Sequence, residues 1–203
     1  GCGIVDIMMH TLERYLTPEG GESDLTDRIA EGLLIATRDA GRRAIADPRD
    51  YEARATLMWA GSVSHNDYTG CGRKRLFPVH KLEHELSAFR DEIAHGAGLS
   101  VLFPAWAEHE MQYDYPRFAQ FANRVLGVEM DFEHPERTAR EGIRTLRRFF
   151  EEIGMPTHLS QLSIKPENYE KLAANTVRTV NGPVKSYSPL DEKAIIEIYR
   201  LAE

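Results

Sequence analysis

The fold prediction for this chain starts from residues 3–15, GIVDIMMHTLERY. Apolar residues recur in this segment with the period of a helix, which predicts a helix over residues 4–16 with one face in a core. Asp6 and His10 are four positions apart, so this helix places both side chains on one face. A carboxylate and an imidazole on the same face of a core helix form half of a candidate metal site.

A second segment, HKLEHELSAFRDEIAHG at residues 80–96, supplies the other half. His80 and His84 have the same four-residue spacing, and His95 follows at the junction with the next expected helix, beside Gly96. Facing each other across a helical core, the two segments can close around a divalent metal. The alternative is that His80 and His84 are polar residues on a solvated helix face, and periodicity alone leaves both interpretations open.

Helical periodicity continues along the chain, and no segment has a convincing strand pattern. Pro, Gly and Asp residues punctuate the pattern and separate the expected helices. These are expected at residues 4–16, 25–46, 51–64, 80–91, from 95 onward, 115–125, 135–153, 169–180 and 191–201. The prediction is therefore one all-α, bundle-like domain of about eight or nine helices over residues 1–203.

Composition excludes several classes of protein. The 203 residues carry a formal net charge of −7, which argues against a general nucleic-acid-binding role. One basic patch, residues 73–75, is expected to be a solvated loop rather than a phosphate site. No apolar run approaches the length of a membrane span, so no membrane association is expected. With only two cysteines, the chain fits a reducing cytoplasm.

The residue types limit the metal. One carboxylate with three imidazoles suits Fe²⁺ or Zn²⁺, and geometry rather than affinity would choose between them. A zinc hydrolase of the HExxH type is disfavoured, because His80 is followed by Lys81 and the general base of that mechanism is missing.

Four segments carry a family resemblance. In order along the chain they are GIVDIMMHTLERYL (3–16), MWAGSVSHND (58–67), FPVHKLEHELSAFRDEIAHGAGLSVLFPAW (77–106) and GMPTHLSQLSI (154–164). Together they resemble the C-terminal domain of the iron-containing (group III) alcohol dehydrogenases, and the butanol dehydrogenase branch above all. The resemblance implies a helical domain of the dehydroquinate synthase-like, iron alcohol dehydrogenase fold.

The resemblance also implies a set of metal ligands. Asp6 and His10 match the first two ligands of the family, His80 matches the third, and His95, in its His-Gly dipeptide, matches the fourth. The metal would be Fe²⁺, Zn²⁺ or another divalent ion, and it would act as a Lewis acid on the substrate oxygen.

Further roles follow from the same resemblance. His84 matches a cleft histidine that is near the metal without ligating it, and it would be the catalytic proton relay beside the nicotinamide cofactor. His65 and Asn66 are expected to line the substrate cleft, with simple turn chemistry as the alternative for both. Glu13 is either a group that orients a ligand or a surface carboxylate.

The implied activity is that of an NAD(P)-dependent alcohol dehydrogenase acting on short-chain, butanol-like alcohols and aldehydes. NAD or NADP would be held mainly by an N-terminal nucleotide-binding domain that is absent from this chain, so we expect these residues to be the C-terminal part of a longer, homodimeric, cytoplasmic enzyme and inactive alone. The alternatives are a polyol (glycerol-type) dehydrogenase, whose three-ligand zinc site would leave His80 or His84 surplus, and a non-catalytic helical interaction domain.

Overall fold

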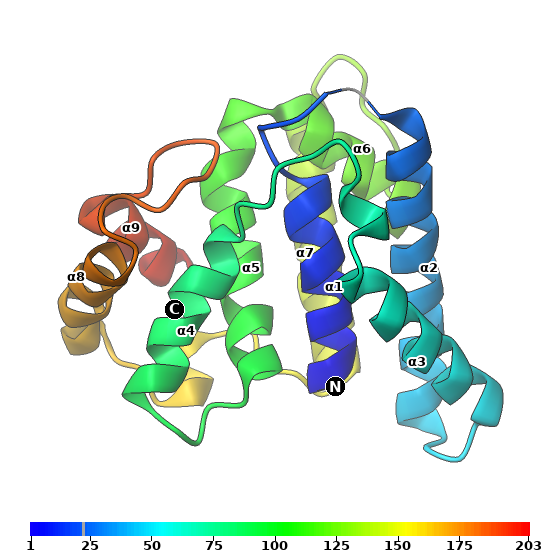
Figure 1. The fold of residues 1–203 in the computed structure, drawn as a ribbon, viewed down its shortest axis with the longest axis horizontal. Coiled ribbons are helices and arrows are strands. Elements are labelled where there is room, and N and C mark those ends of the chain that lie inside the picture. The colour runs from blue at the N-terminus through cyan, green and yellow to red at the C-terminus, as the bar shows by residue number, and fades with distance from the viewer. Residues whose placement is uncertain (22) are drawn as a thin grey trace.

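The computed structural model describes residues 1–21 and 23–203, and these form nine α-helices joined by loops and short 3₁₀ turns (Figure 1). The helices are α1 (Cys2–Tyr15), α2 (Asp24–Ala46), α3 (Tyr51–His65), α4 (Pro78–Phe89), α5 (His95–Glu110), α6 (Tyr115–Leu126), α7 (Pro135–Glu152), α8 (Tyr169–Thr179) and α9 (Glu192–Leu201). Extended pairing within the described ranges is limited to two isolated bridges. The prediction of an all-α domain with eight or nine helices is confirmed.

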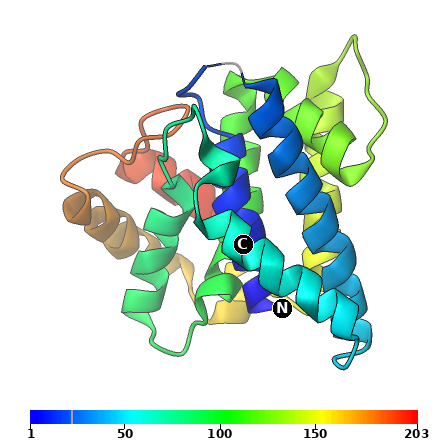
Figure 2. The same ribbon diagram turned by 45° about the vertical axis from the view of Figure 1, so that its right-hand side comes forward.

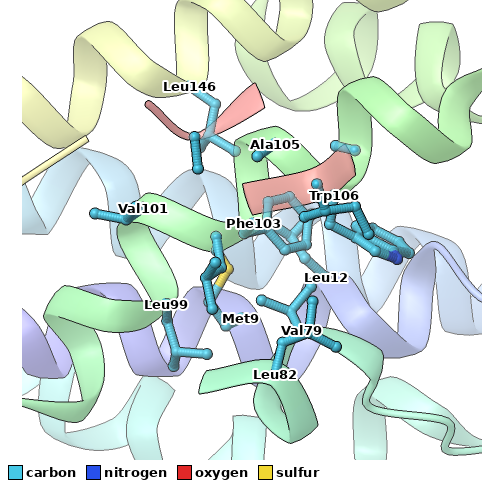
Figure 3. Close-up of a cluster of buried hydrophobic side chains, with 14 of the residues drawn as sticks. Met9, Leu12, Val79, Leu82, Leu99, Val101, Phe103, Ala105, Trp106 and Leu146 are labelled. Atoms are coloured by element: carbon cyan, nitrogen blue, oxygen red, sulfur yellow. The ribbon is translucent and has the colours of Figure 1, made fainter. Parts of the chain in front are cut away.

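Helix α5 forms the centre of the core. It is apolar on nearly every side, and such a helix must be enclosed by others. Figure 3 shows Phe103 and Trp106 of α5 among side chains from α1, α4 and α7, including Leu12, Leu82 and Leu146. Even so, no helix in the described part of the chain combines the length and apolarity needed to cross a bilayer.

Helix α1 lies between α5 on one side and the α2–α3 pair on the other, as Figures 1 and 2 both show. Its apolar residues face these neighbours, and Val5, Met8, Met9 and Leu12 are fully buried. Helices α8 and α9 pack together beside α4 and α5. This arrangement brings one polar face of α1 close to the end of α3, to α4 and to the first turn of α5.

Gly96 allows α1 and α5 to approach each other closely. A Cβ atom at this position would lie 2.4 Å from the carbonyl oxygen of Cys2 and 2.6 Å from its Cα. Only glycine fits such a contact between two backbones. The close approach places the first turn of α5, which begins at His95, against the first turn of α1.

The basic patch at residues 73–75 is structural, and the prediction of a solvated loop is wrong for its first residue. Arg73 is nearly buried and forms an ion pair with Asp27 of α2, which Arg117 of α6 also contacts. A shared carboxylate thus ties the loop that precedes α4 to two helices. The other two residues of the patch, Lys74 and Arg75, form ion pairs with acidic residues at the surface.

Candidate metal centre

Six polar side chains from four helices meet on the exposed side of α1. They come from the middle of α1, the last residue of α3, the first two turns of α4 and the first residue of α5, and they are Asp6, His10, His65, His80, His84 and His95. All four ligands that the resemblance implied are among them.

Three imidazoles converge on one carboxylate oxygen. The Nε2 atoms of His10, His80 and His95 each lie 3.6 Å from Oδ1 of Asp6. This spacing is longer than a hydrogen bond, and Oδ1 is buried without a hydrogen-bond partner in the described structure. Two ligands bound at about 2.0–2.2 Å to one tetrahedral ion are about 3.3–3.6 Å apart. Asp6, His10 and His80 therefore fit a divalent cation, since one ligand atom of each lies within 4.8 Å of the others, and His95 lies within reach of the same Asp6 oxygen.

His80 is oriented by Glu13. The fully buried carboxylate of Glu13 accepts from Nδ1 of His80 and, at 2.6 Å, from the backbone N–H of Val79. Because a carboxylate only accepts, the proton of a neutral His80 is on Nδ1, and its Nε2 then has a free lone pair. That Nε2 atom is buried without a hydrogen-bond partner among the residues described, and it faces Asp6. A carboxylate behind a histidine is the usual arrangement around a metal ligand.

Glu83 orients His95 as Glu13 orients His80, and the sequence did not lead us to predict this role of Glu83. Its fully buried carboxylate accepts from Nδ1 of His95 and from the hydroxyl of Ser87. Gly98 provides the space, because a Cβ there would lie 2.6 Å from Cγ of Glu83. Two signals in the sequence pointed to it: Glu83 is three positions after His80, and a second helical glycine follows Gly96.

Protonation of the metal-free site follows from this geometry. Burial would lower the pKa of His80, but its interactions with Asp6 and Glu13 outweigh burial and raise this pKa to about 9. Burial and the neighbouring His80 lower the pKa of His10 to about 4. Burial opposes the ionisation of Asp6, but the surrounding imidazoles prevail and lower its pKa. Near neutral pH the metal-free site thus holds an ionised Asp6, a neutral His10 and a protonated His80, and His80 must release its Nε2 proton when a cation binds.

The remaining candidates lie at the rim. His84 is exposed, with its ring centroid 5.5 Å from that of His95, and partial burial together with the neighbouring His95 lowers its pKa. His65 lies with Nε2 at 3.5 Å from Oδ2 of Asp6. Asn66 is exposed at the end of α3, and its side-chain oxygen accepts from the backbone N–H of Tyr68 at 3.3 Å. The structure thus brings His65 to the cluster and gives Asn66 a turn contact.

Known proteins share both this sequence and this fold. The chain is 36% identical over 200 residues to NADH-dependent butanol dehydrogenase A of Clostridium acetobutylicum, an alignment that covers 98% of the chain and 51% of that protein. It is 32% identical over 162 residues to the NADPH-dependent aldehyde reductase YqhD of Escherichia coli, covering 80% of the chain and 41% of that protein. The chain therefore spans about half the length of such relatives.

A crystal structure of NADH-dependent butanol dehydrogenase A from Thermotoga maritima superimposes with a TM-score of 0.91 at 31% identity, over 99% of this chain and 51% of that one. Residues 2–202 match the family described as Fe-containing alcohol dehydrogenase, C-terminal. The match covers almost the whole chain, including each of the four elements that form the candidate metal centre. On this evidence the chain belongs to the Fe-containing alcohol dehydrogenase family and corresponds to its C-terminal part.

Proposed function

We propose that residues 1–203 form the metal-binding domain of an NAD(P)-dependent alcohol dehydrogenase that interconverts short-chain, butanol-like alcohols and aldehydes. The observation that carries the proposal is the convergence of three Nε2 atoms on one unpaired oxygen of Asp6, each at 3.6 Å. The names of the relatives, butanol dehydrogenase and aldehyde reductase, support the substrate class.

In this proposal Asp6, His10, His80 and His95 bind one divalent metal, with Fe²⁺ favoured by the family and Zn²⁺ as the other candidate. A bound metal supplies a Lewis acid for the alcohol or aldehyde oxygen, while NAD or NADP exchanges the hydride. Glu13 and Glu83 keep the imidazole protons on Nδ1 of His80 and His95, so both Nε2 atoms stay available.

His84 is proposed as the proton relay, beside the nicotinamide. Its imidazole is next to His95 but exposed to solvent, so a nitrogen of His84 can accept the proton of a substrate hydroxyl and pass it to water. Its lowered pKa keeps the ring neutral near pH 7, which a base requires. His65 is proposed to line the same cleft. Asn66 makes a turn contact in the structure, and its place in the cleft stays a prediction.

The glycerol-type alternative is less well supported. A three-ligand zinc site would leave one histidine surplus, whereas His10, His80 and His95 are equidistant from Asp6 Oδ1. A non-catalytic interaction domain would have no use for two fully buried carboxylates, Glu13 and Glu83, behind two of these rings. Homodimeric assembly and a cytoplasmic location stay predictions.

The test is a calorimetric titration of the purified, chelator-treated chain with Zn²⁺ and, without oxygen, with Fe²⁺. We expect one ion per chain, and loss of binding in His80→Ala. The chain alone should not reduce NAD or NADP with butanol, because the nucleotide is expected to be held mainly outside these residues. Absence of stoichiometric metal binding, with the helical circular dichroism intact, would refute the metal-binding function.

A further inference from the structure

His10 differs from the other two histidines whose rings face Asp6. Hydrogen bonds from Nδ1 to buried carboxylates orient the rings of His80 and His95. The Nδ1 atom of His10 is also buried, but it has no hydrogen-bond partner within the described part of the chain. The orientation of His10 therefore depends on how its ring is packed.

Phe77 supplies a large part of this packing. The centroid of its ring lies 5.3 Å from that of His10, with the planes at 61°, and 5.0 Å from that of His80, with the planes at 86°. Both are edge-to-face arrangements, which aromatic rings favour. The guanidinium of Arg14 lies over the same ring, with its Cζ atom 5.3 Å from the centroid. One aromatic side chain thus contacts two of the proposed ligands.

Arg14 is itself held in place. Its side chain is only 3% exposed. It donates to the carbonyl oxygen of Ser64, to Oγ1 of Thr69 at 3.4 Å and to Oδ1 of Asp67 at 3.2 Å. These acceptors lie at the end of α3 and in the turn that follows it. The cation over the ring of Phe77 is therefore a fixed support for that ring.

The backbone of Phe77 has an uncommon conformation. Its φ is +50° and its ψ is +53°, in the left-handed region that glycine favours. A bulky residue is rare there, and the following Pro78 favours an extended conformation instead. Such a conformation persists only where the surrounding structure imposes it, and it is typical of functional sites. The contacts of the ring with His10, His80 and Arg14 provide such surroundings.

From these contacts we propose that Phe77 is a positioning residue for the metal ligand His10, and that its ring holds Nε2 of His10 toward Asp6. The inference rests on the proposed metal site and goes beyond its ligands and their carboxylates. The ring of His65 also stacks on that of His10, with centroids 3.9 Å apart, but 43% of its side chain is exposed. Phe77 is half-buried and supported by Arg14, so it is the more firmly held of the two neighbours.

The experiment is a Co²⁺ titration of the chelator-treated chain, followed by calorimetry and by the visible ligand-field spectrum, with stability measured by urea unfolding. The variants are Phe77→Gly, which removes the ring and suits the positive φ, Phe77→Leu, which replaces the ring by an aliphatic side chain, and Phe77→Tyr, which keeps the ring. Far-ultraviolet circular dichroism checks folding, and the leucine variant decides if the glycine variant loses helicity.

Phe89→Gly is the matched control. Phe89 is also half-buried, and it also has a cation over its ring, with Nζ of Lys171 at 5.4 Å from the centroid. It lies at the other end of α4 from the candidate metal centre. Loss of this ring should lower the stability of the fold and leave the Co²⁺ affinity and the visible bands unchanged.

If Phe77 positions His10, Phe77→Gly and Phe77→Leu weaken Co²⁺ binding about tenfold and shift the visible bands, whereas Phe77→Tyr retains both. The inference is overturned if Phe77→Gly binds Co²⁺ as tightly as the unmodified chain, or if Phe77→Tyr binds it as weakly as Phe77→Gly. It is also overturned if Phe89→Gly weakens binding as much, because the loss would then follow stability alone. Failure of the whole metal site is distinguishable, because the unmodified chain would then bind no Co²⁺ and would match His80→Ala, which overturns the proposed function together with this inference.

Discussion

Replacing Gly96 by alanine tests whether the contact between α1 and α5 sets both the stability and the metal site. The new Cβ would lie 2.4 Å from the Cys2 oxygen, about 1 Å closer than an ordinary contact at 3.4 Å. All three Cys2 atoms nearest to the new Cβ belong to the backbone, so the first turn of α1 must move. Overpacking of this kind costs about 2–3 kcal/mol, and alanine recovers up to about 1 kcal/mol as a better helix former. The net loss is therefore about 1–3 kcal/mol.

Urea unfolding of the metal-free chain, followed by circular dichroism, measures this loss. Gly32→Ala is the control, because Gly32 is exposed within α2 and a Cβ there meets nothing within 4 Å. That variant should gain about 0.5–1 kcal/mol. Gly96→Ala should also weaken Zn²⁺ binding, since His95 precedes it and Asp6 is on α1. The reasoning is refuted if Gly96→Ala is as stable as the unmodified chain.

Three further outcomes are expected. His95→Ala should lose the metal, whereas His84→Ala should keep it and, in an active enzyme, change the pH dependence of turnover; metal loss in His84→Ala, by elemental analysis, would make His84 a ligand. Glu83→Gln should weaken Zn²⁺ binding about 10–100-fold in calorimetry, because the orientation of His95 depends on Glu83, and an unchanged affinity would contradict this role. Glu110 is fully buried and accepts from Ser186 and Ser188; burial opposes its ionisation, but His109 and these bonds lower its pKa. The ionised Glu110 therefore stabilises the fold above pH 4.5, its ordinary pKa, and this stabilisation is lost as the pH falls through the lower pKa of the folded state. Glu110→Gln should consequently make the stability, measured by urea unfolding, fall less steeply at acid pH. An unchanged pH dependence would contradict this role of Glu110.

The helices could be predicted because their signals are local. The apolar period of residues 4–16, and the Pro and Gly residues between segments, fixed the existence of each helix, and the structure moves most ends by only one or two residues. The buried position of Arg73 could not be predicted, because Asp27 and Arg117, which enclose it, come from distant helices. Long-range ion pairs of this kind leave no periodic trace in a sequence.

The site shows the same division. Asp6 with His10, and His80 with His84, follow from spacing on a helix, because four-residue separations are geometric facts. Spacing on a helix cannot predict which oxygen of Asp6 faces which imidazole, because this depends on how α1 crosses α4 and α5. Glu83 was missed for this reason: its role exists only because Gly98 of the next helix leaves room for its side chain.

The candidate ligands are far apart along the chain, and this has a thermodynamic consequence. A metal bound to α1, α4 and α5 at once would act as a removable cross-link that closes a long loop, as a disulfide does. An ion that binds only the folded chain adds about 2.7 kcal/mol of stability when its free concentration is 100 times its dissociation constant. Chelator-treated and metal-loaded preparations should therefore melt at different temperatures, and a partly loaded one should melt in two steps.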